Sequence, residues 1–390
     1  MEEQTKRLES PVIRISDFDY SLPQELIAQT PIEPRDASRL LVLNRSNGTI
    51  EHRHFRDIGA YLRPGDLLIA NQSRVLPARM LGRRAETGGA VEVLLLAERP
   101  DVGPDHWETL VRPGRRLREG SRIVFGDDNG MKQAVTLCAE ILQHTEAGGR
   151  IVRFWVRDAG SPAAAQGDDE SRHHISVREL IEQLGRMPLP PYIHETLADP
   201  ERYQTVYARI TGSAAAPTAG LHFTPHLLEQ LRRQGVRIGF VTLHVGLDTF
   251  RPIESEDIRE HKMHSETIDL AIPTAELINE TRRAGGRVVA VGTTAVRVLE
   301  SVAGFYKERK GRIEPYHGAT RLFITPGYRF KAVDLMLTNF HLPRSTLFML
   351  VAAFSGLDTM QRAYAHAIHN GYRFYSYGDA CLLFPAAPQV

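Results

Sequence analysis

Buried strands alternate with amphipathic helices along the second half of the chain. Apolar runs predict strands at Val236–Val245, Val288–Val291 and Asp334–Phe340. Helical patterns lie between them, among others at Thr274–Arg283 and Ser345–Phe354. This alternation predicts an α/β, or mixed α+β, domain built around a sheet.

The segment Leu76–Val156 has a different pattern. Short apolar runs separated by Gly, Pro, Asp and Asn predict about six strands and no helix, which is typical of a small barrel or sandwich. We therefore predict a large α/β (mixed α+β) domain formed by residues 1–75 and 157–390, with a small all-β domain, either a barrel or a sandwich, inserted at residues 76–156. The small polar residues of 158–175 predict a mobile loop.

Composition indicates an ordinary globular protein. The chain has 390 residues, of which 42% are hydrophobic and 24% charged, so it can bury a large core. No apolar run approaches the roughly 20 residues that span a bilayer. The start, MEEQTKRLES, lacks the apolar stretch of a signal peptide, so we expect a cytoplasmic protein. Cys138 and Cys381 are too few for a disulfide framework or a cysteine zinc site.

Arginines are unevenly distributed, although the formal net charge is only +1. Clustered arginine on a neutral protein favours a local phosphate-binding face, and the alternative is a solvated surface. One cluster contains Arg112, Arg115, Arg116, Arg118 and Arg122, and a second contains Arg74, Arg79, Arg83 and Arg84.

The link Asn339–Ser345 joins the predicted strand Asp334–Phe340 to the helix Ser345–Phe354. It carries an amide, an imidazole, a guanidinium and hydroxyls, and such strand-to-helix links are where open α/β sheets bind ligands. The alternative is a capped loop in which Ser345 or Thr346 satisfies the helix N-terminus.

Other polar stretches offer further candidates. Gly292-Thr293-Thr294 follows a buried strand and opens a helix, so its N–H groups suit a carboxylate or a ribose hydroxyl, although helix capping explains it equally well. His222 and Phe223 offer an acid/base group and a stacking face, and His244 stands at a strand end. A zinc site at His261, His264 and Glu266 is possible but lacks the H-E-x-x-H arrangement.

These stretches together resemble one family, the S-adenosylmethionine:tRNA ribosyltransferase-isomerases of the queuosine pathway. The matching segments keep the family's order and span nearly the whole chain. They are PRDASRLLVL (34–43), NQSRVLPARMLG (71–82), PLPPYI (188–193), RYQTVYA (202–208), APTAGLHF (216–223), HVGLDTFRP (244–252), HKMHSE (261–266), VGTTAVRVLES (291–301), FITPGYRFKAVDLMLTNFHLPRSTL (323–347), AYAHAI (363–368) and YRFYSYGDACLL (372–383). One departure is Leu247-Asp248, where family members have a small residue and Gly, which puts the geometry near Thr249 in question.

The resemblance implies transfer and isomerisation of the ribosyl part of S-adenosylmethionine onto 7-aminomethyl-7-deazaguanine at the tRNA wobble position. Epoxyqueuosine-tRNA forms, and adenine and methionine leave. It also implies a two-domain fold with an inserted β-barrel, no metal, and no cofactor, because S-adenosylmethionine is consumed as a substrate. We expect a monomer with no membrane partner.

Physical chemistry and the family motifs together give the site candidates. The sulfonium acidifies the C5′ hydrogens, so a base must reach that carbon, and water must be excluded from the reactive intermediates. As catalytic candidates we name His222, His244, His264, His341, Glu266 and Asp379. As substrate-binding candidates we name Arg74, Arg79, Thr218, Phe223, Thr249, Thr293, Thr294, Arg297, Asn339, Arg344, Ser345 and Tyr375. Arg112, Arg115 and Arg116 are expected to contact tRNA phosphates.

Within this set we expect Arg344, Thr293 and Thr294 to hold the methionine carboxylate or ribose, and Tyr375 or Phe223 to stack on a base. Three other classes of protein stay as alternatives. An S-adenosylmethionine-dependent RNA methyltransferase would show a Gly-rich loop after its first strand, which this sequence lacks. A noncatalytic RNA-binding protein would need only the basic face, and a metal hydrolase would rest on His261, His264 and Glu266 alone.

Overall fold

The protein is described by a computed structural model that covers residues 13–126, 135–145, 148–158, 175–246, 256–261, 263–306 and 311–385. The chain forms two compact units. The first comprises residues 1–71, 217–243 and 248–390, and the second comprises residues 72–216 and 244–247. We call them the sheet unit and the barrel unit.

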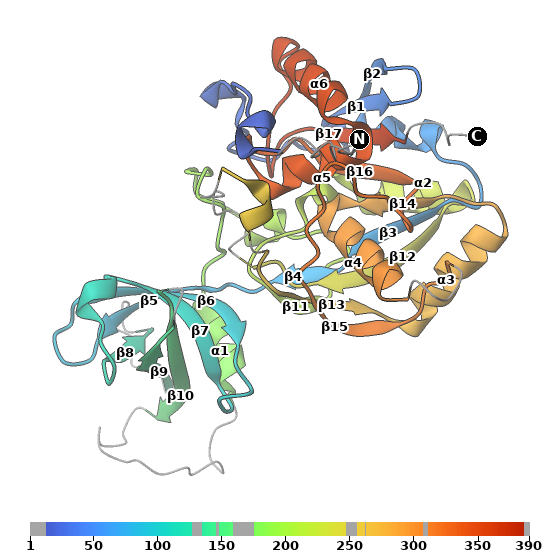
Figure 1. The fold of residues 1–390 in the computed structure, drawn as a ribbon. Coiled ribbons are helices and arrows are strands. Elements are labelled where there is room, and N and C mark those ends of the chain that lie inside the picture. The colour runs from blue at the N-terminus through green and yellow to red at the C-terminus, as the bar shows by residue number, and fades with distance from the viewer. Residues whose placement is uncertain are drawn as a thin grey trace, which may run out of the picture. The chain divides into compact units, whose positions relative to one another are not determined.

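The sheet unit is built on a nine-stranded sheet (Figure 1). Its order is β15 (Tyr316–Thr320), β13 (Glu266–Leu270), β12 (Arg237–Leu243), β3 (Leu67–Asn71), β14 (Val288–Val291), β16 (Leu335–Asn339), β17 (Ala380–Phe384), β1 (Arg39–Asn44) and β2 (Thr49–His54). The central strands β12, β3, β14 and β16 are parallel neighbours. Every residue of β3, β14 and β16 is buried, which explains why they read as continuous apolar runs.

Helices cover this sheet and pack against one another. They are α2 (Pro225–Arg233), α3 (Ile272–Arg283), α4 (Gly292–Phe305), α5 (Thr346–Ser355) and α6 (Leu357–His369), with 3-10 helices at Ile15–Phe18, Gln24–Leu26, Arg35–Ala37, Phe55–Tyr61, Thr218–His222 and Ile258–Glu260. The long helix α4 packs across β12, β3, β14 and β16. Thr224 caps α2 by accepting the N–H of Leu227 at 3.1 Å.

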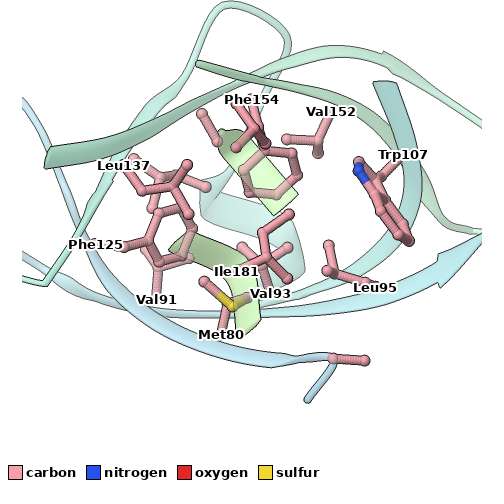
Figure 2. Close-up of a cluster of buried hydrophobic side chains, with 14 of the residues drawn as sticks. Met80, Val91, Val93, Leu95, Trp107, Phe125, Leu137, Val152, Phe154 and Ile181 are labelled. Carbon is pink, nitrogen blue, oxygen red and sulfur yellow. The ribbon is translucent and has the colours of Figure 1, made fainter. Parts of the chain in front are cut away.

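The barrel unit contains a closed antiparallel barrel of strand order β10-β7-β6-β5-β8-β9. The strands are β5 (Arg79–Arg84), β6 (Ala90–Glu98), β7 (His106–Arg112), β8 (Arg122–Phe125), β9 (Val135–His144) and β10 (Arg150–Asp158). Figure 2 shows the interior, where Met80, Phe125, Leu137 and Phe154 pack together with Ile181 of α1 (Val177–Leu184). A two-stranded parallel sheet of β4 (Ser73–Val75) and β11 (Ile210–Ser213) and 3-10 helices at Gly114–Arg116 and Pro200–Tyr203 complete the described elements.

The predicted fold class is confirmed, because a mixed α/β unit accompanies a closed six-stranded antiparallel barrel. The compact unit that holds the barrel is larger than the predicted segment 76–156, however. It includes α1, whose Val177, Leu180 and Ile181 belong to the barrel core, so the residues up to 216 group with the barrel. Most of the loop predicted at 158–175 lies outside the described residues.

Candidate active site

One end of the sheet collects most of the predicted site residues of the sheet unit. The parallel strands β12, β3, β14 and β16 end there, at Leu243, Asn71, Val291 and Asn339. The antiparallel neighbours β13 and β17 begin there, since Ile268 pairs with Leu243 and Ala380 pairs with Asn339. We call this the carboxyl end. It is the place where open α/β sheets bind their ligands.

His222 ends the short 3-10 helix Thr218–His222, which contacts β16 and α4 at the carboxyl end. The side chain is only 4% exposed, and its ring stacks on Phe55 with centroids 4.9 Å apart. Nδ1 lies 2.8 Å from the Ser38 hydroxyl. Nε2 makes no hydrogen bond of normal geometry with the described residues, although the Asn339 side chain acts on the ring as a hydrogen-bond partner. Buried polar atoms are nearly always satisfied, so Nε2 is an atom that a ligand would engage.

Burial lowers the pKa of His222 to about 4, although the neighbouring Asn339 side chain opposes this shift. The imidazole is therefore neutral near pH 7 and can accept or donate a proton in one of its tautomers. Phe223, the next residue, is 1% exposed and packs edge-on against Phe55 at 4.9 Å. The structure thus gives Phe223 a packing role in the core.

Asn339 ends β16 and is 3% exposed. Its Nδ2 donates to the carbonyl of Tyr375 at 2.9 Å, whereas Oδ1 has no partner among the described residues. Asn339 Oδ1 and His222 Nε2 are both buried without a hydrogen bond of normal geometry, and the two side chains are close enough for Asn339 to raise the His222 pKa as a hydrogen-bond partner.

His341 follows β16 directly, and its Nε2 lies 2.8 Å from the Thr338 hydroxyl. Its backbone is held on both sides, because its N–H donates to the Tyr364 hydroxyl at 3.0 Å and its carbonyl accepts from Tyr20. Burial lowers the pKa of His341 to about 3. His341 is therefore also neutral near pH 7.

The two histidines with lowered pKa values, the buried His222 and the half-buried His341, predict acid sensitivity of the fold. Their folded-state pKa values, about 4 for His222 and about 3 for His341, lie below the ordinary value of 6.5, so the unfolded chain takes up these protons first. Stability should fall as the pH drops below about 6.5, by roughly 2 kcal/mol per histidine near pH 4.5. Denaturant unfolding at several pH values measures this, and His222→Gln and His341→Gln should each flatten the dependence. Replacement of the exposed His226 should not; equal pH slopes in all variants would contradict the assignment.

Glu266 and Arg297 form a buried ion pair at the carboxyl end. Glu266 begins β13, Arg297 lies on α4, and the two side chains contact directly while being 4% and 5% exposed. His264 adds a third group, with its Nε2 3.3 Å from Glu266 Oε1. Because Arg297 neutralises Glu266, the cluster is a fixed arrangement of charges rather than a free carboxylate.

The first turn of α4 follows β14, which lies between β13, the strand of Glu266, and β16, the strand of Asn339, in the sheet order. Gly292 adopts a φ of +85°, and a Cβ there would lie 3.4 Å from the Cβ of Ala219, so glycine allows the turn from β14 into the helix. Thr293 and Thr294 follow at the N-terminus of the helix, and Thr294 Oγ1 is buried without a partner among the described residues. Thr218 opens the 3-10 helix that contacts α4. The arrangement offers N–H groups and hydroxyls for a carboxylate or ribose.

Asp379 has a structural role in this region. Its two carboxylate oxygens accept the backbone N–H groups of Arg39 and Arg373, each at 2.8 Å. Burial raises the pKa of Asp379, and these two hydrogen bonds oppose the shift. The carboxylate therefore positions the starts of β17 and β1.

Strained backbone marks the same region. Among the described residues the non-glycine positions with positive φ are Asp105, Arg344 and Tyr375, and the last two flank the carboxyl end at +55° and +69°. A bulky side chain in this conformation costs about 1–3 kcal/mol and is found mainly at functional sites. Arg344 contacts Glu256 at 3.2 Å and Asp19 at 3.8 Å. Ser345 caps α5 by accepting the N–H of Phe348 at 3.2 Å, which is the capping role considered for it.

Several predicted residues belong to the barrel unit instead. Arg74 pairs with Glu201, and Arg79 pairs with Glu92 at 2.9 Å. The ring of His244 lies against Gly212, where a Cβ would approach it to 2.8 Å. The tRNA candidates Arg112, Arg115 and Arg116 are exposed. Thr249 and the departure at Leu247-Asp248 lie outside the described residues.

Sequence reasoning did not single out Ser38, which holds His222 Nδ1, or Thr338, which holds His341 Nε2. Ser38 is 184 positions from its partner, so only tertiary structure connects them. Their place in the chain could have indicated both residues, because each hydroxyl lies at or beside the carboxyl end in a segment that matches the family. The alternative zinc site finds no support, since the described residues contain no group of three His, Cys, Asp or Glu side chains placed to hold a metal ion. Within those residues, no helix has the length and apolar character to cross a membrane.

The sheet, its polar carboxyl end and the accessory barrel define an α/β enzyme with an inserted β-barrel. The chain belongs to the family described as queuosine biosynthesis protein, whose profile matches residues 15–383. It is 55% identical over 372 residues to the S-adenosylmethionine:tRNA ribosyltransferase-isomerase of Symbiobacterium thermophilum, covering 95% of this chain and 100% of that relative. The same-named protein of Moorella thermoacetica is 53% identical over 371 residues, with the same coverage.

A crystal structure of S-adenosylmethionine tRNA ribosyltransferase from Thermotoga maritima is also similar. It is 40% identical to this chain, with a TM-score of 0.51, and the match covers 95% of this chain and 100% of that one. The family resemblance seen in the sequence is therefore confirmed.

Proposed function

We propose that this protein is an S-adenosylmethionine:tRNA ribosyltransferase-isomerase of queuosine biosynthesis. The observation that carries the proposal is the match to enzymes of that name over 95% of this chain and 100% of theirs. The geometry supports it, because neutral imidazoles, an ion pair and a helix N-terminus gather at one end of the sheet.

The proposed reaction transfers the ribosyl part of S-adenosylmethionine to the aminomethyl nitrogen of 7-aminomethyl-7-deazaguanine in the tRNA wobble position. Adenine and methionine leave, and the ribosyl group becomes the epoxide-bearing ring of epoxyqueuosine. S-adenosylmethionine is consumed as a substrate, and the proposal requires no cofactor or metal. The tRNA substrate places the activity in the cytoplasm, and nothing in the reaction demands more than one copy of the chain.

His222 is the strongest candidate for the proton transfer at C5′. Its neutral imidazole is buried, and its Nε2 makes no hydrogen bond of normal geometry within the described residues, although the Asn339 side chain interacts with the ring. In the tautomer whose Nδ1–H donates to the Ser38 oxygen, Nε2 carries a lone pair that can accept a proton. Thr293, Thr294 and the N-terminus of α4 are placed to bind the ribose hydroxyls or the methionine carboxylate. Burial keeps water away from the reactive intermediates.

The experiment that tests the function is incubation of purified protein with S-adenosylmethionine and tRNA carrying 7-aminomethyl-7-deazaguanine, without added metal. Mass spectrometry should detect adenine, methionine and a ribosyl-sized mass gain on the nucleoside. S-adenosylhomocysteine with a methyl-sized gain would instead identify an RNA methyltransferase. Tight tRNA binding without turnover would favour a noncatalytic RNA-binding protein.

Arg112, Arg115 and Arg116 are expected to contact tRNA phosphates. Arg150 supports the 3-10 helix Gly114–Arg116, because its buried guanidinium donates to the carbonyl of Gly114 at 3.2 Å. Changing all three exposed arginines to glutamine should lower the slope of log affinity against log salt by about three. Filter binding across a salt series measures the slope, and S-adenosylmethionine binding serves as the control. Unchanged tRNA affinity would contradict the prediction.

A further inference from the structure

The outer face of the barrel carries arginines around a tryptophan. Phe125, Leu137, Val152 and Phe154 point into the core in Figure 2. Because successive side chains on a strand point to opposite faces, the residues between them point outward. These outward residues are Arg122 and Val124 on β8, Thr136, Cys138 and Glu140 on β9, and Arg153, Trp155 and Arg157 on β10. We call them the β8–β10 face.

The strand register places these side chains in adjacent rows. Glu140 pairs with Arg122 on one side and with Arg153 on the other. In the next row, Cys138 pairs with Val124 and with Trp155. Directly opposite residues on antiparallel strands lie roughly 5 Å apart, so the side chains of each row are neighbours across three strands, and Cys138 in the middle of the second row is only 3% exposed. Arg83 of β5 extends the second row, because it pairs with Val124.

The arginines of this face differ from others in the barrel unit. Arg79, Arg99 and Arg178 are paired with Glu92, Asp101 and Glu98 at 2.9, 2.7 and 3.0 Å. Arg122, Arg153 and Arg157 form no ion pair with a carboxylate in the described part of the chain, where Glu140 is the acidic residue between them. The face thus has an excess of positive charge that is available to an anionic partner.

Trp155 adds an aromatic surface to this charge. The Arg153 guanidinium lies over its indole ring, 5.5 Å from the centroid. The face of the indole ring is therefore accessible to a planar group. An unpaired nucleobase is also planar and can stack on an aromatic ring. The other tryptophan of the chain, Trp107, is 6% exposed and packs in the barrel core.

We propose that the β8–β10 face binds the RNA substrate, with Arg122, Arg153 and Arg157 contacting phosphates and Trp155 stacking on an unpaired base. This assignment rests on the proposed function, which supplies the RNA. A looped or single-stranded segment fits better than a duplex, because only an unstacked base offers its face to an aromatic side chain. The face is separate in sequence from Arg112, Arg115 and Arg116, so the two basic surfaces can be tested independently.

The test combines tryptophan fluorescence with salt-dependent binding of the substrate tRNA. Titration with tRNA should quench Trp155, so quenching should persist in Trp107→Phe and disappear in Trp155→Phe. Trp155→Leu should weaken binding about 5- to 100-fold, the range of losing one stacked base. The triple variant Arg122→Gln, Arg153→Gln, Arg157→Gln should lower the salt slope by about two to three. Arg178→Gln, which removes an arginine already paired with Glu98, is the matched control.

The outcomes separate this assignment from the proposed function. Normal product formation with an unchanged salt slope in the triple variant and unchanged quenching in Trp155→Phe would overturn the β8–β10 face and leave the function intact. Failure of the native protein to release adenine and methionine, with the predicted binding changes observed, would overturn the function and retain the face as an RNA-binding surface. A native protein without measurable tRNA affinity would overturn both.

Discussion

Replacing His222 with glutamine is expected to lower kcat by about 10²–10⁴-fold, the range that a well-placed acid or base contributes. Glutamine approximates the size of histidine and can still hydrogen-bond to Ser38, which lies 2.8 Å from Nδ1. It cannot take up a proton at neutral pH. The loss should therefore appear in the chemical step, and single-turnover release of adenine measures it.

The structure explains why His222 is chosen over the other candidates. His341 is half-buried and also neutral, but its Nε2 is engaged with Thr338 at 2.8 Å. His264 faces Glu266 at 3.3 Å, and the ring of His244 packs against Gly212. The matched control is His226→Gln, an exposed histidine on the first turn of α2, which should keep the native rate. A near-native single-turnover rate in His222→Gln would remove His222 from the list and direct attention to His341→Gln.

The sheet could be predicted from local sequence because its central strands are buried on both faces. β14 is apolar throughout, and β3 and β16 are apolar up to their polar ends at Asn71 and at Thr338-Asn339, so the type and approximate bounds of these strands follow from the pattern alone. The barrel was predictable for a different reason, since its strands alternate between side chains that face the core and side chains that face outward. The extent of the barrel unit could not be predicted from sequence. The amphipathic pattern of α1 shows that one side of the helix is buried, but it does not show that this side packs in the barrel core.

The sequence indicated that several candidate residues lie at one end of the sheet, but it did not assign their roles. Strand ends and helix starts marked Thr293, Asn339 and His341, and topology does bring them to one end of the sheet. Roles depend on partners far away in sequence. Asp379 is engaged by two backbone N–H groups, and Glu266 is neutralised by an arginine 31 positions away. No local pattern encodes these contacts, so the carboxylates and the four histidines could not be ranked.

Removing Arg297 is expected to destabilise the sheet unit by about 3–5 kcal/mol, the usual cost of leaving a buried charge without its partner. Arg297→Met would leave the Glu266 carboxylate, which is 4% exposed, without its ion-pair partner on α4. The double variant Glu266→Leu, Arg297→Met should recover most of the loss, because an apolar pair of similar volume is often as stable as a buried ion pair. Denaturant unfolding of the single and double variants measures both effects. The exposed pair Arg178–Glu98 is the control, and Arg178→Met should cost at most about 1 kcal/mol.

Kinetic measurements on the single variant Arg297→Met and on the double variant show whether the Glu266–Arg297 pair is only structural or also binds substrate. If Glu266 and Arg297 only hold β13 against α4, the double variant should regain activity together with stability. If they contact S-adenosylmethionine, as predicted for Arg297, the double variant should be stable yet raise the KM for S-adenosylmethionine or lower kcat by at least tenfold. We expect the second result, because the pair lies at the carboxyl end next to the first turns of α4, where a ligand carboxylate or amine would meet fixed charges of both signs. A stable double variant with native kinetics would make this pair structural and leave the binding of the methionine end to Thr293, Thr294 and Arg344.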